Sequence, residues 1–254
     1  MLSKKTWADK PLPLLQTPSA TNDTPGHPAH YIANEMVFAH NAMLRGLNAI
    51  YNQAPNIPSS DVADFLFFTA SWTAWVKHHH IIEETTMFPS FEKVKGVKSG
   101  SLQHNAEQHH GFSDGLNTLY QYSTETQPPN YSGKKVQELI DGFAGLLYQH
   151  LADEIDTLWA MDSVPANTAE AGQILTVYKQ CEAEAGKQDK NVVPPMVLGL
   201  CDKTFQGGNE WPKMPWGSAY IVHYLFARKH RGAWRFLPCD TWGQPRELLF
   251  ASEE

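Results

Sequence analysis

The chain has 254 residues, with 20 Lys and Arg against 27 Asp and Glu, and therefore a formal net charge of -7. A nucleic-acid binder usually carries a basic surplus, so this charge argues against that class of protein. No apolar run is long enough to cross a bilayer, and the N-terminus shows no signal-peptide pattern. The three cysteines are widely separated in the sequence, so we expect a reduced, cytoplasmic setting without a disulfide scaffold.

Residues 1–27 are rich in Pro, Thr and Asn and predict an extended N-terminal arm. Apolar periodicity then predicts four long helices joined by short loops, over residues 28–51, 61–88, 102–123 and 132–160. Four helices with short links are typical of an antiparallel four-helix bundle with up-down topology. The expected fold class is therefore all-α.

Residues 161–254 predict a C-terminal extension that packs on the bundle. A capping pattern, with Asn167 in the cap position and Glu170 three residues later, opens a fifth helix that reaches about residue 187. From Pro194 onward the chain contains Gly207-Gly208, several prolines and many of the tryptophans, which indicates a partly irregular structure. The predicted divisions of the chain are 1–27, 28–160 and 161–254.

Histidine is the outlier of the composition, with 12 residues. Each residue turns an α-helix by about 100°, so the direction of each His can be compared with the apolar stripe of its own helix. This comparison places one His of each bundle helix on the inward face: His40, His79, His109 and His150. Glu83 and Glu154 follow one turn after His79 and His150 and share their faces.

The same comparison places several neighbouring polar residues away from the apolar faces. His78 and His80 lie on opposite flanks of the second helix, and Glu84 lies further round. We expect these three residues at the edge or the surface of the bundle. His110 likewise lies off the stripe of the third helix.

Two carboxylates buried among aromatic and aliphatic residues are costly unless a cation compensates them. A single inward His is more often a hydrogen-bonded core residue than a ligand, and a His and a Glu can pair without metal. Four central His with two central Glu fit two metal ions better. Bundle cores hold dinuclear sites in this way, with bridging carboxylates and terminal imidazoles.

Four motifs carry a resemblance to a known family: HNAMLR at 40–45, HHIIEETTMFP at 79–89, EQH at 107–109 and HLADE at 150–154. Together they resemble hemerythrin-like (HHE cation-binding) domains over about residues 28–160. The C-terminal segments 205–212 and 234–240 resemble an extension found in fungal members.

The resemblance implies a four-helix bundle with a non-haem di-iron centre. His40, His79, His109 and His150 would be terminal ligands, and Glu83 and Glu154 would bridge the ions. Mn or Zn could replace iron at such a His/Glu site.

One position departs from the family pattern. Hemerythrin-type sites often have a second His one turn after the third-helix ligand, where this chain has Ser113. An alcohol is a poor iron ligand, so we expect an open coordination position. An open position favours activation of O2 or peroxide over simple oxygen carriage. Arg45, Tyr120 and Tyr148 are further candidates to contact the ligands or a bound oxidant.

The resulting hypothesis is a di-iron (Fe2+/Fe3+) protein that binds and activates O2 or peroxide, as an oxidase or oxygenase of a small organic molecule. One alternative is a non-catalytic protein for iron or oxygen binding, storage or sensing. Another is a non-redox acid–base or hydrolytic enzyme, in which Glu83 or Glu154 would be the acid or base. The sequence indicates no particular oligomeric state.

Overall fold

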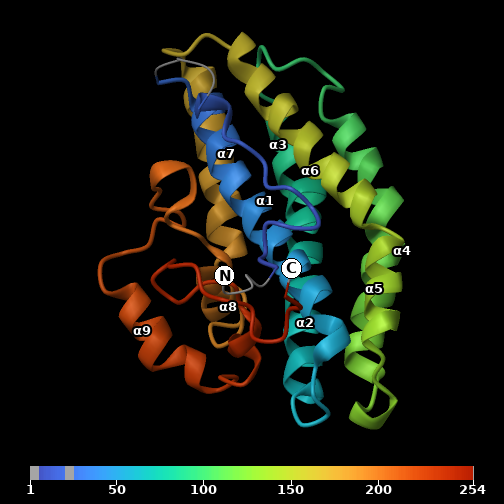
Figure 1. The fold of residues 1–254 in the computed structure, drawn as a ribbon. Helices are drawn as coiled ribbons and strands as arrows, with labels where there is room; N and C mark the ends of the chain where they lie inside the picture. The colour runs from blue at the N-terminus through green and yellow to red at the C-terminus, as the bar shows by residue number, and fades with distance from the viewer. Residues whose placement is uncertain (1–5, 21–25, 254) are drawn as a thin grey trace.

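The computed structural model describes residues 6–20 and 26–253 (Figure 1). Every regular element within these ranges is helical, and β-type pairing there is limited to isolated bridge residues such as Cys239 and Pro245. The predicted all-α class is confirmed. Over the same residues, no helix combines the length and the apolar character needed to cross a membrane.

Successive long helices run in opposite directions and form the predicted up-down bundle (Figure 1). Their bounds are α1 Pro28–Gln53, α2 Val62–Ile82, α4 Gln103–Glu125, α5 Gly133–Asp141 and α6 Ala144–Trp159. α5 and α6 together take the place of the fourth helix of the bundle.

The prediction of a single helix over residues 132–160 is wrong, because the helix is interrupted between Asp141 and Ala144. Ser132 caps α5 by accepting a hydrogen bond from the Lys135 amide at 3.2 Å, but the helix ends at Asp141. Phe143 leaves the helical path with φ −135° and is almost fully buried. Its side chain fills the space above Gly115 of α4, where an added Cβ would come within 2.5 Å of it. The break therefore turns Phe143 into the core.

The second predicted helix also changes geometry near its end. After Ile82 the chain forms a wider π-helical turn, Glu83–Met87, in which the Phe88 amide donates to the Glu83 carbonyl. A short helix, α3 Phe88–Phe91, follows. Such wide turns are rare and frequently lie at functional sites. This one begins at Glu83, a predicted metal ligand.

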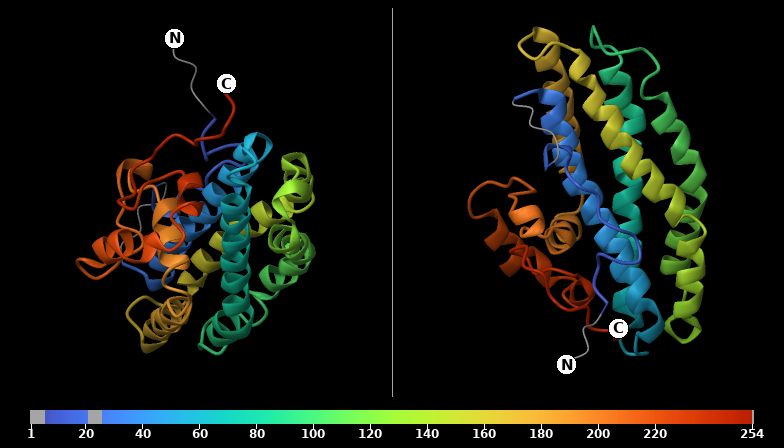
Figure 2. Two further views of the ribbon diagram at one scale, coloured as in Figure 1. Left: turned by 90° about the horizontal axis from the view of Figure 1, so that it is seen from below. Right: turned by 45° about the horizontal axis from the view of Figure 1, so that its top comes forward.

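The C-terminal segment lies along α1 and α2, on the side of the bundle away from α5 (Figure 2). Its helices are α7 Ala169–Ala185, α8 Val193–Leu200 and α9 Ser218–Tyr224. Thr168, not Asn167, caps α7, because its hydroxyl accepts from the Ala171 amide at 3.2 Å. The chain beyond α8 consists largely of short turns, in agreement with the irregular character predicted for it.

The described part of the N-terminal arm is held against α1 by asparagines. Asn41 and Leu15 exchange two hydrogen bonds, from the Leu15 amide to Oδ1 at 2.8 Å and from Nδ2 to the Leu15 carbonyl at 2.9 Å. Two turns further on, Asn48 binds the backbone of Leu12 and Ala8. Residues 1–5 and 21–25 of the predicted arm lie outside the described residues.

The two largest apolar clusters of the core have a polar layer between them. One cluster contains Leu44 and Leu47 of α1, Trp72 of α2 and Leu147 of α6. The other contains Met36, Met87, Ile155 and their neighbours toward the opposite end of the bundle. His40, His79, His109 and His150 fall at the junction of the two clusters along their helices. The predicted ligands therefore occupy one level of the bundle.

A glycine allows α1 to approach α2 closely beside this level. A Cβ on Gly46 would lie only 2.3 Å from the Trp72 Cδ1 atom. The Trp72 indole is fully buried, and its Nε1 donates to the Met43 carbonyl at 3.0 Å. The indole is thus fixed from both sides and cannot move aside easily.

We expect Gly46→Ala to lower the free energy of unfolding by about 1–3 kcal/mol, because the methyl group overlaps the indole in a closely packed core. Gly172→Ala on α7 is the matched control, since nothing lies within 4 Å of its added Cβ. The control should be neutral or stabilising by up to about 1 kcal/mol. Urea denaturation measures both, and equal effects would contradict the close approach.

Candidate metal centre

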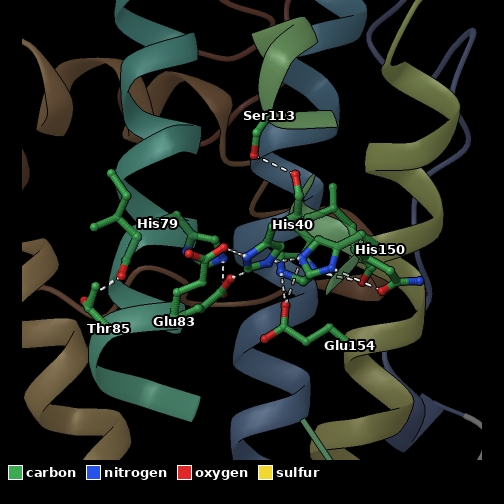
Figure 3. Close-up of polar contacts among 12 residues, drawn as sticks. His40, His79, Glu83, Thr85, Ser113, His150 and Glu154 are labelled. Atoms are coloured by element: carbon green, nitrogen blue, oxygen red, sulfur yellow. Dashed lines mark hydrogen bonds and ion pairs between the residues drawn. The ribbon is translucent and has the colours of Figure 1, made fainter. Parts of the chain in front are cut away.

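The six residues predicted as ligands converge in the middle of the bundle (Figure 3). They come from four helical segments: His40 from α1, His79 and Glu83 from α2 and its π turn, His109 from α4, and His150 and Glu154 from α6.

Each carboxylate lies between imidazoles from two different helices. Glu83 Oε1 is 2.6 Å from His79 Nε2, and Glu83 Oε2 is 3.6 Å from His109 Nε2. Glu154 Oε2 is 3.4 Å from His40 Nε2 and 3.6 Å from His150 Nε2. This arrangement is the one that a bridging carboxylate requires.

Most of these polar atoms are buried without hydrogen bonds, although His109 Nε2 and His150 Nε2 lie 3.1 Å apart, within hydrogen-bond distance of each other. Glu83 is 1% exposed and Glu154 is fully buried. Among the described residues, neither oxygen of either carboxylate has a partner of hydrogen-bond geometry, and the same holds for Nε2 of His40 and His79. Buried polar groups are normally hydrogen-bonded, and a buried carboxylate needs a compensating charge. The donor set therefore fits a bound cation.

His80 belongs to the same cluster, although the sequence analysis placed it at the edge or surface. It is only 5% exposed. Its ring centroid lies 4.6 Å from that of His109 and 5.1 Å from that of His150. Neither of its ring nitrogens has a hydrogen-bond partner in the described part of the chain. The prediction for His80 was wrong.

The error arises because α2 is buried on more than one side. It packs against α4, and the extension, through α7, α8 and residues 233–236, covers another part of its surface. His79 and His80, about 100° apart around the helix, therefore both point into protein. A helix that is apolar all round is a buried helix, and this property of 62–82 was the available signal. His110 and Glu84 are exposed, as predicted, and His78 is half-buried.

The side chains form two groups that could each hold a metal ion. One group is His80, Glu83, His109 and His150, and the other is His40, His79, Glu83 and Glu154. Within each group the ligand atoms lie within 4.8 Å of one another. Glu83 belongs to both groups, so its carboxylate could be shared by two ions.

Comparison with known proteins identifies the bundle. Residues 31–161 match the family model described as the hemerythrin HHE cation binding domain. The chain belongs to this family. The family model ends where the bundle ends, so it does not include the C-terminal extension.

One relative is similar over nearly the whole chain. It is the dimeric xanthone biosynthesis cluster protein R11 of Cryptosporiopsis sp. (strain 8999), which is 38% identical over 255 residues. The alignment covers 98% of this chain and 95% of the relative, so the similarity continues through the extension. No solved structure gave a significant match.

In this hemerythrin HHE domain, the far nitrogens of three imidazoles are held by other groups. His40 Nδ1 donates to the Leu151 carbonyl at 2.8 Å, and His109 Nδ1 donates to Glu84 Oε1 at 2.7 Å. His150 Nδ1 lies 3.4 Å from Gln108 Oε1. Such bonds fix the tautomer, so that the Nε2 lone pair faces the centre. The sequence analysis missed the contacts of Glu84 and Gln108.

The other residues proposed near the site take different positions. Ser113 donates its hydroxyl to the His109 carbonyl at 2.6 Å and is not directed at the cluster (Figure 3). Arg45 contacts the Leu200 carbonyl and the Phe205 ring of the extension, not a carboxylate of the site. The exposed Tyr120 ring packs under the Lys77 ammonium. Tyr148 forms no side-chain hydrogen bond with any described residue. The roles proposed for Arg45, Tyr120 and Tyr148 are not supported.

Burial sets the ionisation of the cluster. It lowers the pKa of His79 to about 4 and that of His150 to about 3, which keeps these imidazoles neutral near pH 7 and available as ligands. Burial alone would raise the pKa of Glu154, but the neighbouring His40 outweighs it and holds the value at about 2. Burial and the Glu154 carboxylate raise the pKa of Glu83. A cation between the two carboxylates would remove that repulsion.

Substitution of His80 tests whether it is a ligand. We expect His80→Ala to reduce the metal content of the purified protein by about one ion per chain, since its group would keep only three of its four donor residues. His78→Ala, at the half-buried His two residues earlier, should bind as much metal as wild type. Mass spectrometry of metal content measures both. If His80→Ala binds as much metal as wild type, His80 is not a ligand and only packs in the core.

The carboxylate behind His109 should tune metal affinity. We expect Glu84→Gln to weaken binding about 10- to 100-fold, the usual effect of removing a group that orients a ligand. Glu107→Gln is the control, because Glu107 is an exposed residue of α4 that bonds only to Gln103. Competition with a chelator measures the affinities, and equal values for the two variants would exclude a role for Glu84.

Proposed function

We propose that this protein is a non-haem di-iron oxidase or oxygenase that uses O2 or peroxide to oxidise a small organic molecule. The two four-residue groups described above would hold the ions. Imidazole and carboxylate ligands suit iron, and also manganese or zinc. Iron, when bound, supplies the redox chemistry that side chains lack.

The observation that carries the proposal is a cavity beside the cluster. It has a volume of about 520 Å³ and is lined by His79 and Glu83 at one end. Both residues belong to the group with two imidazoles, whereas the other group has three. The ion with fewer nitrogen ligands would therefore face the cavity. A substrate or oxidant needs space beside the ions, and this cavity provides it next to His79.

The space for a substrate therefore lies beside His79 and not at Ser113, where the sequence predicted an open position. The serine is not a ligand, but His80 brings a fifth imidazole to the centre, so the missing histidine leaves no gap at that position. The open side lies across the cluster, toward His79 and the extension.

The surrounding chain would keep water away from the centre. Apolar clusters close the bundle on both sides of the polar layer, with Phe112 and Leu151 on one side and Ile155 and Phe88 on the other. Exclusion of water strengthens electrostatic interactions within a site and limits side reactions. The bonds to Leu151 and Glu84 hold His40 and His109 in position without movement during a reaction.

The relative supports a role in biosynthesis. Its name places it in a biosynthesis cluster for dimeric xanthones. We extend to this chain a role in the biosynthesis of a small organic molecule, because the similarity includes the extension that lines the cavity.

A second candidate is a non-catalytic protein that binds iron or oxygen. The observation that favours it is the ligand set of five histidines and two glutamates, which is more complete than the sequence analysis expected. In that case the cavity would have no substrate.

Metal analysis and oxygen uptake together test the proposal. We expect about two iron ions per chain, and irreversible O2 consumption by the Fe2+-loaded protein with ascorbate as reductant. In the His79→Ala/Glu154→Ala double variant, O2 consumption should be lost and the iron content should fall by about one ion per chain, because two of the four ligands of the group beside the cavity are removed. His110→Ala, at an exposed position, should behave as wild type.

Two other results would overturn the oxidase assignment. Reversible uptake, in which O2 is released under reduced pressure, would establish the binding protein. Zinc, or no metal at all, in protein purified from iron-supplemented cells would favour the non-redox alternative.

A further inference from the structure

The cavity beside the cluster is built mainly by the extension. One wall consists of α1 and α2, and the other consists of α7, α8 and residues 211–214. The same two sides of the molecule lie next to each other in both ribbon views of Figure 2. Most of the lining residues follow residue 161 and therefore lie outside the hemerythrin HHE domain.

The walls of the cavity are mainly apolar and rich in aromatic and methionine side chains. They include the thioethers of Met36, Met87 and Met214 and the rings of Trp75, Tyr178 and Trp211. Aromatic and methionine side chains make favourable contacts with ring faces and ring edges. A cavity of about 520 Å³ is within the range that accommodates small organic ligands. These walls fit a planar molecule with fused rings.

The inner end of the cavity is the metal cluster. The side chain of His79 is 18% exposed, while that of Glu83 beside it is only 2% exposed. His79 is thus the imidazole of the cluster that is most open to a molecule in the cavity. A ring seated between the apolar walls would direct one edge toward this residue.

Away from the cluster, the cavity is lined by one carboxylate, Glu182, and one ammonium group, Lys213. Lys213 Nζ lies 3.8 Å from Glu35 Oε1 and 4.9 Å from the centre of the Tyr31 ring, so its charge is already engaged. Glu182, one turn after Tyr178 on α7, lines the cavity, is exposed and forms no ion pair with any described residue. It interacts with the Tyr178 hydroxyl, and a carboxylate has further lone pairs for a second donor. Burial raises the pKa of Glu182 and of Glu35, which reflects a setting that disfavours further negative charge.

The polar group left for a ligand is therefore a hydrogen-bond acceptor. At the outer end, an anionic ligand would meet the carboxylate of Glu182 and the pair of Glu35 and Lys213. A neutral hydroxyl group can instead donate to Glu182, and a hydrogen bond to a charged acceptor is among the stronger ones. The charges thus select against a carboxylated ligand and in favour of a phenol.

We propose that this cavity binds a neutral, planar, hydroxylated aromatic molecule, with its rings between the Met and Trp walls and a hydroxyl donating to Glu182. As the substrate of the metal centre this molecule rests on the function proposed above, but its binding requires no turnover. The extension is then the part of the chain that selects the substrate, and the bundle is the part that holds the metal.

Equilibrium binding to the purified full-length protein tests the proposal, with the metal content measured on each sample. The probes are 2-naphthol, which is neutral and donates a hydrogen bond, and 2-naphthoate, which has the same rings and a negative charge. Fluorescence of the probes follows binding. We expect 2-naphthol to bind at least about tenfold more tightly than 2-naphthoate, a difference of about 1.4 kcal/mol.

Variants of α7 locate the bound probe. Ala185→Trp places a large ring in the cavity and should abolish the binding of 2-naphthol, and Glu182→Ala should weaken it about tenfold by removing the acceptor. Glu184→Ala is the matched control, because Glu184 pairs with Lys187 outside the cavity and its loss should change nothing. Unchanged helical circular dichroism and metal content show that each variant is folded.

The outcomes separate this proposal from the proposed function. Equal or tighter binding of 2-naphthoate would overturn the neutral phenol, and equal binding of 2-naphthol to wild type and Ala185→Trp would overturn the cavity as its site. Absence of 2-naphthol binding in a protein that holds iron and consumes O2 would also reject the proposal, while leaving the oxidase intact. Specific binding without O2 consumption would support the pocket and reject only the oxidase.

Discussion

The structure depends on two carboxylates buried in the middle of a helical bundle. Glu83 and Glu154 are almost inaccessible, and their oxygens have no hydrogen-bond partner among the described residues. An uncompensated pair of this kind would cost several kcal/mol or force one group to stay protonated. Imidazoles from four helices surround the pair, and apolar clusters close both sides. A bound cation would compensate the charge of both carboxylates. It would also connect the helices that carry the ligands and so stabilise the fold.

Helix α2 contributes two histidines, His79 and His80, to the polar layer around these carboxylates. Its covering by α4 on one side and by the extension on another allows two adjacent residues, His79 and His80, to be buried in different directions. Each then joins a different four-residue group. The π turn that starts at Glu83 places the shared carboxylate between those groups. The result is asymmetric, with three imidazoles in one group and two in the group that faces the cavity.

The sequence predicted the bundle, its helices and one inward His in each, because a 3.6-residue period is a local property that survives folding. His80 could not be placed in this way, since the comparison assumed one buried stripe and α2 has more. The break at Phe143 depends on the space above Gly115, and the position of Arg45 depends on Leu200 and Phe205. These contacts join residues far apart in the sequence, so no local period reveals them.

The C-terminal extension covers the side of the bundle on which His79 lies. Without α7, α8 and the loop at 211–214, His79 would lie at an open face of the bundle, and the apolar residues of α2 on that side would be exposed to water. The buried Arg45, which reaches the Leu200 carbonyl, and the asparagines of α1, which bind the N-terminal arm, fasten the added segments to the same helix that carries His40. A bundle alone suffices to hold metal. The added chain encloses a space beside the metal ligands, and enclosing such a space is useful only if a molecule enters it.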